Sequence, residues 1–159
     1  MKAAIVMGSK SDYPVVERAE AVFREFGVDC ETRIISAHRT PRIAEEFASK
    51  AEENGIEVII AAAGKAAHLG GVLAAYTAMP VIGLPIKSST LDGLDSLLSI
   101  VQMPKGVPVA TVAIDGAENA ALLAVQILSV KYTELREKMK SYKIKMEEEI
   151  AKQDRELHL

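Results

Sequence analysis

The sequence lacks the features that mark several large classes of protein. It contains no tryptophan, only 4% aromatic residues and a single cysteine, Cys30, among its 159 residues. One thiol cannot form an internal disulfide, and no Cys/His cluster has the spacing of a zinc site, so we expect a reducing cytoplasmic compartment and no metal. No apolar run is long enough to cross a bilayer, and the amino terminus becomes polar too early for a signal peptide.

An excess of positive charge is also missing. Nineteen Lys and Arg residues face 22 Asp and Glu residues, which gives a net charge of −3. A general nucleic-acid binder needs clustered surplus Lys and Arg, so we expect neither nucleic acid nor a membrane as partner. The 49% hydrophobic and 26% charged residues are typical of one soluble globular domain with a substantial core.

Short β-branched runs alternate with helical patterns along the chain, which is typical of a parallel sheet covered on both faces. Because strand–helix–strand crossovers are right-handed, the simplest fold is a three-layer α/β/α sandwich. We expect a five-stranded parallel sheet that is Rossmann-like, with a flavodoxin-like strand order. Ligands of such sheets bind at the carboxyl ends of the strands, which directs attention to the loops after the first three strands. The predicted strands are residues 3–7, 30–35, 58–62, 81–84 and 107–114.

Residues typical of helix ends stand between these runs. Asp12 can cap a helix that carries Pro14 in its first turn, and Gly27 stands where a C-terminal glycine is expected. Thr40 and Pro41 begin the next helix, which closes near Gly55. Further helices are expected over about 66–78, from Asp92 and from near Gly116.

The carboxyl-terminal segment differs in composition from the rest. We divide the chain into an α/β domain over residues 1–131 and a helical arm over 132–159. Apolar residues recur three, four or seven apart in this Lys- and Glu-rich segment, which predicts a long amphipathic helix. Its apolar stripe is narrow, so the arm either lies across a neighbouring subunit instead of closing its own core, or is a solvated surface helix.

The loop after the first strand contains Gly8, Ser9, Ser11 and Asp12. Glycine allows a sharp turn, and hydroxyl groups beside a helix N-terminus can hold a phosphate. Alternatively, Ser11 or Asp12 only caps the helix. Neither the Walker pattern nor G-x-G-x-x-G is present, so neither a nucleoside triphosphate nor a dinucleotide is indicated.

The loop after the second strand brings together Ser36, His38 and Arg39. Arg39 can bind a phosphate with two hydrogen bonds, and His38 can give or take protons near neutral pH. The loop after the third strand contains Gly64, Lys65, His68 and Leu69. Its small residues allow close approach to a ligand, although they also suit a tight helix entry with His68 in solvent.

The residues outside these loops offer less. Cys30 lies within a predicted strand and is expected to be a small core residue, and His158 is expected to be solvated. The residues alone therefore predict an α/β domain that binds a small phosphorylated molecule. They provide His38 for proton transfer and contain no cofactor signature.

Four motifs, quoted in chain order, carry a resemblance to a known family. They are MGSKSD (7–12), SAHRTP (36–41), AGKAAHL (63–69) and GLDSLLSIVQMPKGVPVATVAI (93–114). Through about Tyr132 the chain resembles the N5-carboxyaminoimidazole ribonucleotide mutases, the PurE enzymes of purine biosynthesis. The resemblance implies an isomerase without a cofactor, acting on a small ribonucleotide. It also implies a homo-octamer with shared active sites and C-terminal helices packed across neighbours, and hand-off from the ATP-dependent carboxyaminoimidazole ribonucleotide synthase.

The resemblance also assigns roles to residues of these motifs. His38 becomes the general acid/base, and the strip from Ala63 to Leu69 lines a carboxylate or carbon dioxide pocket. The substrate-binding residues implied are Ser9, Asp12 and Arg39 on the ribonucleotide and Ser36 on its phosphate, with Gly8, Ser11, Gly64, Lys65, His68 and Leu69 around them.

The chain departs from the family pattern at two positions. Lys65 stands where the mutases usually have glycine, and Gly70 where they usually have proline. Related aminoimidazole ribonucleotide carboxylases, which use free carbon dioxide, often have a basic residue at the position of Lys65. They typically lack a match to His68 and have lysine in place of Arg39, so we expect a mutase, with the carboxylase as the alternative. A receiver-type signalling domain is an alternative without catalytic activity. It would need acidic residues after the first and third strands, where this chain has Gly8-Ser9 and Ala63-Gly64, so the sequence does not favour it.

Overall fold

Five parallel strands form one sheet in the order β2-β1-β3-β4-β5. The computed structural model describes residues 1–158, so Leu159, the last residue of the expected arm, lies outside the described residues. The observed order is the flavodoxin-like order, and this prediction is confirmed. The strands are β1 (Lys2–Met7), β2 (Asp29–Ile34), β3 (Val58–Gly64), β4 (Val81–Ile86) and β5 (Ala110–Thr111).

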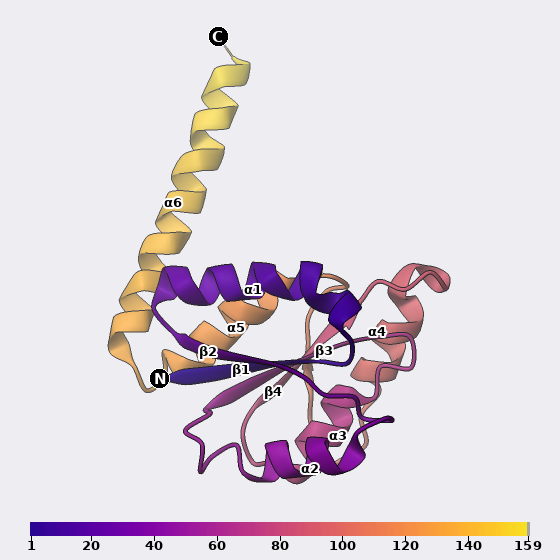
Figure 1. Ribbon diagram of the computed structural model, residues 1–159. Coiled ribbons are helices and arrows are strands. Elements are labelled where there is room, and N and C mark those ends of the chain that lie inside the picture. Colours follow the sequence, from indigo (N-terminus) through magenta and orange to yellow (C-terminus); the bar gives the residue numbers. More distant parts are fainter. Residues whose placement is uncertain (159) are drawn as a thin grey trace.

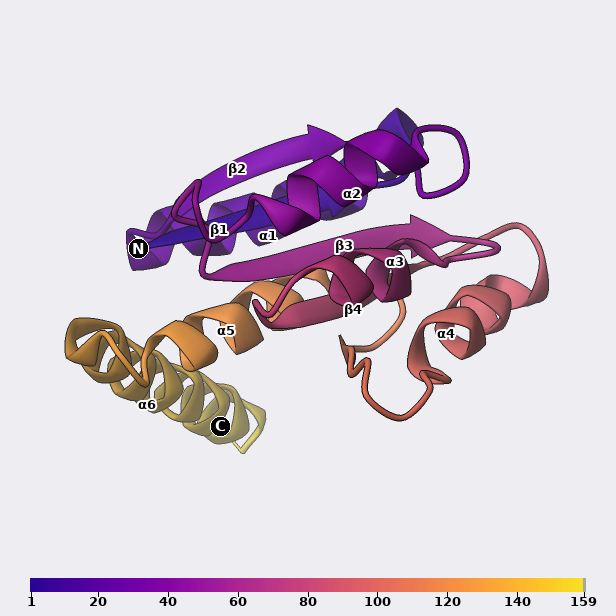
Figure 2. The same ribbon diagram turned by 90° about the horizontal axis from the view of Figure 1, so that it is seen from below.

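Helices cover both faces of the sheet, as Figures 1 and 2 show. One face packs against α1 and α5, and the other packs against α2, α3 and α4. The three-layer sandwich predicted from the alternating pattern is therefore confirmed. The helices are α1 (Tyr13–Phe26), α2 (Pro41–Ser49), α3 (Leu69–Tyr76), α4 (Leu94–Val101), α5 (Ala117–Leu128) and α6 (Thr133–Leu157), with short 3₁₀ turns η1 (Lys10–Asp12) and η2 (Leu91–Gly93).

The inner strand β1 shows why β1, β3 and β4 are largely apolar, in contrast to the edge strand β2. Successive side chains point to opposite faces. Ala3 and Ile5 join the cluster under α1 and α5, whereas Ala4 and Val6 join the cluster under α2 and α3. All four are fully buried. A strand with helices on both faces has no solvated side, so its sequence reads as a continuous apolar run.

The fifth strand is much shorter than the predicted segment 107–114. Only Ala110 and Thr111 pair with β4 as a regular ladder. Two further bonds continue the contact, from the Val112 N–H to the Gly83 carbonyl and from the Asp115 N–H to the Pro85 carbonyl. Pro85 has no N–H to donate on this side of β4, so the ladder is interrupted there.

The ends of α1 are partly as expected. Pro14 stands in its first turn, and Gly27 ends it in the left-handed conformation with φ 74°. The Asp12 side chain, however, makes no capping hydrogen bond. Ser9 instead accepts a hydrogen bond from the Ser11 N–H at the start of η1. Asp12 therefore stands at the N-cap position of α1 as predicted, but the predicted capping bond is absent, and the carboxylate accepts a hydrogen bond from the Ser11 hydroxyl instead.

Two other helices differ from prediction at their ends. Helix α2 stops at Ser49, and a series of turns then leads to Gly55, whose φ is 73°. Helix α3 begins at Leu69 instead of near Ala66. The N–H groups of Ala67 and His68 bond to carbonyls only two residues earlier. These tight turns occupy the segment in which the helix was expected to start.

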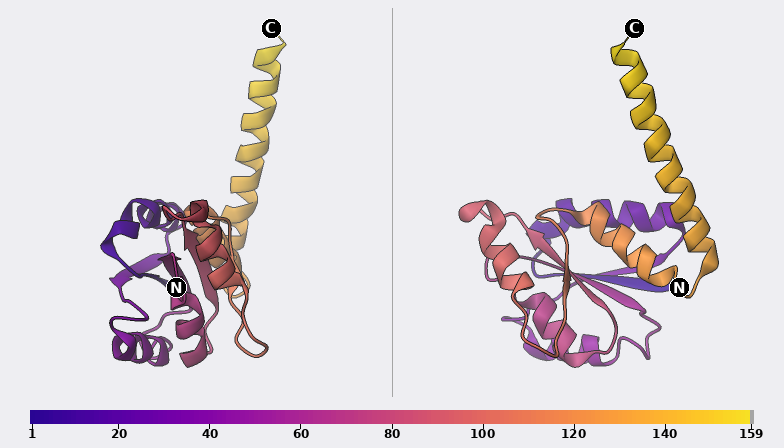
Figure 3. Two further views of the ribbon diagram at one scale, coloured as in Figure 1. Left: turned by 90° about the vertical axis from the view of Figure 1, so that its right-hand side faces the viewer. Right: turned by 180° about the vertical axis from the view of Figure 1, so that it is seen from behind.

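The long helix α6 has two parts with different surroundings. Leu135 and Met139 are buried in the core, the Phe26 and Tyr142 rings pack 5.7 Å apart, and the Lys138 ammonium donates to the Phe26 carbonyl. The expectation that the arm does not close its own core is therefore wrong for its first turns. Beyond Tyr142 the helix projects away from the sandwich (Figures 1 and 3) and exposes Ile144, Met146 and Ile150.

Gly83 of β4 offers a test of the packing between the sheet and α4. A Cβ atom at this glycine would lie 2.2 Å from Cγ2 of Ile100. We expect Gly83→Ala to lower the free energy of unfolding by about 1–3 kcal/mol, because overpacked cores must shift. Gly70→Ala is the matched control, since its Cβ would meet only ordinary contacts of 3.5 and 3.6 Å and alanine favours a helix. Denaturant unfolding that ranks the two variants equally would contradict this account.

Candidate active site

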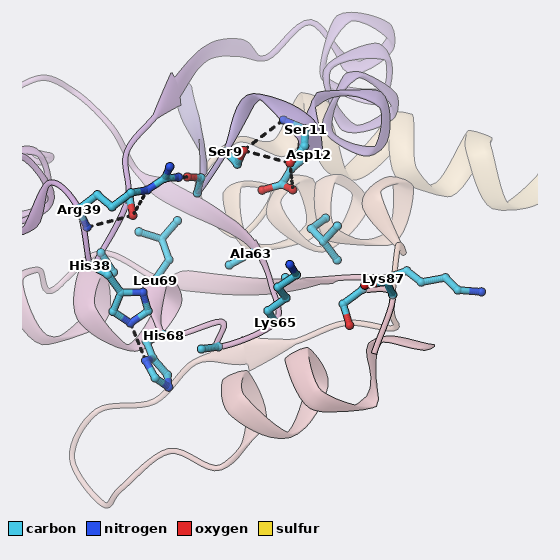
Figure 4. Close-up of a pocket in the computed structure, with 18 residues that line it drawn as sticks. Ser9, Ser11, Asp12, His38, Arg39, Ala63, Lys65, His68, Leu69 and Lys87 are labelled. Carbon is cyan, nitrogen blue, oxygen red and sulfur yellow. Dashed lines mark hydrogen bonds between the residues drawn. The ribbon is translucent and has the colours of Figure 1, made fainter. Parts of the chain in front are cut away.

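A pocket of about 540 Å³ opens at the carboxyl edge of the sheet. Loops that follow β1, β2, β3 and β4 form its walls (Figure 4). Its volume lies in the range of small-molecule sites. All eleven predicted site residues line it, although their roles stay predictions: Gly8, Ser9, Ser11, Asp12, Ser36, His38, Arg39, Gly64, Lys65, His68 and Leu69.

The loop after β1 holds a buried carboxylate. The Gly8 N–H bonds to the Ala62 carbonyl at 3.0 Å, which joins this loop to the end of β3. The Ser11 hydroxyl donates to Oδ1 of Asp12 at 3.2 Å. Asp12 is only 8% exposed. Burial raises the pKa of Asp12 above its ordinary value, against the opposing effect of hydrogen bonds from Ser11 and Ser9.

The loop after β2 is held in shape by its own hydrogen bonds. Thr40 Oγ1 accepts from the Ser36 N–H at 2.9 Å and donates to the Ser36 carbonyl at 3.0 Å. Ser36 Oγ accepts from the Arg39 N–H and from its Nε. Nη2 of Arg39 donates to the Gly8 carbonyl at 3.1 Å. Arg39 therefore links this loop to the first loop, and its guanidinium lies at the pocket wall.

The loop after β3 combines a strained residue with small ones. Lys65 has φ 56°, in the left-handed region that a residue with a Cβ atom rarely adopts. A Cβ on Gly64 would lie 3.3 Å from the Ile86 carbonyl, so the backbones of β3 and β4 approach closely there. His68, at the entry to α3, lies with Nδ1 2.8 Å from Nε2 of His38. The third loop thus joins the second through two imidazole rings.

A fourth loop, which sequence reasoning missed, completes the pocket. Ile86, Lys87, Ser88 and Ser89 line it from the end of β4. The Lys87 N–H donates to Oδ1 of Asp115 at 2.8 Å. The single hydroxyl proton of Ser88 has two acceptors within reach, the Asp95 carboxylate and the Thr90 carbonyl. The signal was the polar run Lys87 to Thr90 directly after an apolar strand, the same pattern that identified the other three loops.

Basic groups outnumber acidic ones at the pocket. Arg39 and Lys65 line it, against the single carboxylate of Asp12. Lys87 also lines the pocket, but its side chain extends away in Figure 4 and its ammonium pairs with Asp92 at 3.3 Å. Hydroxyl groups of Ser9, Ser11 and Ser36 add donors. This set suits an anionic ligand that also carries hydroxyl groups. Among residues 1–158, no three His, Cys, Asp or Glu side chains gather as metal ligands.

Cys30 and His158 lie outside the pocket. Burial raises the pKa of the Cys30 thiol to about 11, so its reactive thiolate is disfavoured. Nδ1 of His158 lies 2.8 Å from the Asp154 carbonyl near the end of α6. Within the described chain, no helix is both long and apolar enough to cross a membrane.

Comparison with known proteins assigns the chain to a family. The profile of AIR carboxylase matches residues 2–149. The chain belongs to the AIR carboxylase family. One relative in this family is the N5-carboxyaminoimidazole ribonucleotide mutase of Pyrococcus abyssi, 66% identical over 89% of this chain and 82% of the relative. The mutase of Pyrococcus horikoshii is 60% identical over 96% of this chain and 86% of the relative.

Solved structures agree with this AIR carboxylase assignment. The crystal structure of PurE from Treponema denticola has a TM-score of 0.90 and 30% sequence identity, and the match covers 98% of each chain. The likeness extends over the sandwich and α6 together, because nearly the whole of both chains is matched.

Because the Asp12 carboxylate is buried, we expect its replacement by an amide to raise the stability of the protein in a pH-dependent way. The pKa of Asp12 is higher in the folded state than in the unfolded state. The free energy of unfolding therefore falls as the pH rises from the unfolded-state pKa through the folded-state pKa. We expect Asp12→Asn to abolish this loss, so the variant melts higher than the parent at pH 7 and the difference shrinks toward pH 3.5. Melting curves of Asp29→Asn, an exposed carboxylate, provide the control. A difference independent of pH would exclude Asp12 as the source.

Proposed function

We propose that the chain converts N5-carboxyaminoimidazole ribonucleotide to 4-carboxy-5-aminoimidazole ribonucleotide in purine biosynthesis. The observation that carries this proposal is the meeting of His38, Arg39, Ser9 and Asp12 around one pocket. The names of relatives with 60–66% identity point to the same reaction. Since the pocket offers both an anion site and a proton-transfer group, it suits the rearrangement of a phosphorylated carbamate.

The proposed binding mode follows from the charges on the pocket wall. Arg39, with Ser36 and Ser9 beside it, is suited to the phosphate through charge-assisted hydrogen bonds. Nη2 of Arg39 is held by the Gly8 carbonyl, so the guanidinium is oriented before the ligand arrives. In Figure 4 Asp12 and Arg39 lie on either side of Ser9. The Asp12 carboxylate is an acceptor and is suited to the ribose hydroxyls. Gly8, Ser11, Gly64 and Leu69 line the space between these groups.

The proposed chemistry needs one proton donor and acceptor. Protonated His38 gives a proton to the carbamate nitrogen, the carbon–nitrogen bond breaks, and carbon dioxide and aminoimidazole ribonucleotide form within the site. The electron-rich ring carbon then attacks carbon dioxide, and neutral His38 removes the proton from that carbon. One imidazole thereby serves both half-reactions and ends in its starting state.

Retention of carbon dioxide requires a small pocket without water. Ala63, Ala67 and Leu69 are buried beside the third loop, and Ala66 and Gly64 add little bulk. Such a strip excludes water and leaves few polar partners to compete for the carboxylating agent. No metal, biotin or nucleoside triphosphate enters the proposed reaction.

Lys65 is the residue that favours the alternative activity, a carboxylase that uses free carbon dioxide. Its side chain lines the pocket and forms no ion pair with a carboxylate in the described chain. An ammonium group here suits a carboxylate or bicarbonate, which is the observation that favours an aminoimidazole ribonucleotide carboxylase using free carbon dioxide. Arg39 and His68 favour the mutase, because the related carboxylases typically have lysine in place of Arg39 and lack a match to His68.

A paired assay of the purified protein tests the proposed function. One reaction supplies N5-carboxyaminoimidazole ribonucleotide at low bicarbonate, and the other supplies aminoimidazole ribonucleotide with bicarbonate. We expect fast conversion in the first. Conversion only in the second, near saturating bicarbonate, would establish the carboxylase and would direct attention to Lys65. No turnover in either would contradict both.

Removal of the proposed acid/base separates chemistry from binding. We expect His38→Asn to lower kcat by about 10²–10⁴-fold while the Kd for the product ribonucleotide stays within about threefold, because the Asn side chain retains polarity without proton transfer. Calorimetry measures the Kd, and His158→Asn, outside the pocket, serves as the matched control. A parallel loss of binding and rate would contradict the assigned role.

We further propose that the chain is a cytoplasmic homo-oligomer, an octamer, that receives its labile carbamate from the ATP-dependent synthase. Two surfaces support assembly. The outer half of α6 exposes Ile144 and Ile150, and α4 exposes Leu94, Leu98 and Val101. Exposed apolar side chains grouped on one element are typical of an interface.

Shortening the chain to end at Lys143 tests this assembly. The variant keeps Leu135 and Met139 in the core and removes the exposed residues of the outer half. We expect folded subunits with fewer copies per assembly by multi-angle light scattering. Full-length Ile150→Glu provides a second variant that preserves helix length. An unchanged copy number in both would show that this part of α6 is no interface. Ending at Tyr132 would remove core residues and could not separate folding from assembly.

A further inference from the structure

The two histidines at the pocket form a direct hydrogen bond. Nε2 of His38 and Nδ1 of His68 are 2.8 Å apart. Their rings meet edge to face, with centroids 4.9 Å apart and an interplanar angle of 82°. In Figure 4 the His38 ring points toward His68 and away from Ser9 and Asp12. The bond therefore fixes which ring nitrogen of His38 is engaged in the free protein.

The chemistry of this contact limits where protons can be. A bond between two imidazole nitrogens needs one N–H group and one lone pair, because two facing N–H groups repel each other. Only one proton can therefore occupy the space between Nε2 and Nδ1. When the pair carries one extra positive charge, the bond is charge-assisted and stronger than a neutral one.

The frame around the pair holds both rings in place. The His38 loop is braced by the Ser36–Thr40 bonds and by the Arg39 contact with Gly8. His68 precedes α3 and follows tight turns at Ala66 and Ala67. His38 lies in the loop after β2 and His68 in the loop after β3. Because the sheet positions both loops, the contact between the rings is set by the fold and not by a single mobile loop.

We propose that His68 is a positioning residue for His38. It accepts a hydrogen bond from Nε2–H of His38 in the free enzyme and thereby presents this nitrogen, with its proton, for the first step. The inference rests on the proposed function, because it presupposes the acid/base role of His38. During turnover the carbamate nitrogen takes the place of Nδ1 of His68 at this proton. His38 later recovers a proton from the ring carbon, and His68 neither gains nor loses one.

Nuclear magnetic resonance of the unliganded protein tests the bond directly. In protein labelled with ¹⁵N-histidine, we expect scalar coupling between Nε2 of His38 and Nδ1 of His68, which arises only across a hydrogen bond. The coupling should disappear in His68→Leu and in His38→Asn. Its absence from the parent protein would overturn the proposal, whether or not the enzyme is active.

Kinetics test whether the bond matters for the reaction. The Asn side chain can place an amide oxygen near the position of Nδ1, whereas Leu offers no acceptor. We expect His68→Leu to lower kcat about 10–100-fold, because small misplacements of a reacting group have effects of this size, with KM within about threefold. We expect His68→Asn to recover most of kcat.

The outcomes separate this inference from the proposed function. An active parent whose two His68 variants match it in kcat would overturn the positioning role and leave the function standing. Equal losses in both variants with a raised KM would mean that His68 contacts the substrate, which also overturns it. A parent that turns over neither ribonucleotide in the paired assay would defeat the proposed function, while the coupling still reports on the bond.

Discussion

Burial of β1 and β3 on both faces is the constraint on which the rest of the structure depends. Neither strand has a solvated side, so every backbone group must pair within the sheet and every side chain must pack against a helix. Parallel strands with helical crossovers satisfy both demands. Such strands all end at one edge, which forces the polar loops after them to converge. The pocket is thus a geometric result of the way the core is covered.

The strand order and layers were predictable because their signals are local and repeated. Each apolar run is short, each following helix has glycine or proline near an end, and crossover handedness leaves few arrangements. The length of β5 was not predictable from its own residues. Its C-terminal end reflects Pro85 of the neighbouring strand, which supplies a carbonyl and no donor. Pairing between strands is a tertiary property. The length of an apolar run therefore overstates the length of the paired strand.

For the site, the sequence indicated which residues would meet but not how they are held. Eleven predicted residues share one pocket, because each follows a strand whose end lies at the same edge. Local propensity suggested that Asp12 would cap α1, yet Ser9 makes the first capping bond and Asp12 is buried toward the pocket. The contacts of His38 with His68, and of Arg39 with Gly8, join segments about 30 residues apart. No spacing rule relates such positions.

The two parts of α6 place different limits on sequence divergence. Leu135 and Met139 at its root belong to the core, so replacements there must preserve volume and apolar character. The outer turns project away from the sandwich (Figure 1) and expose Ile144 and Ile150, so packing within the subunit restricts their sequence little. Descendants of one ancestral chain can therefore differ in the length and composition of this outer segment while keeping the sandwich and pocket intact. In the proposed assembly, this segment can change the contacts between subunits without refolding the α/β domain.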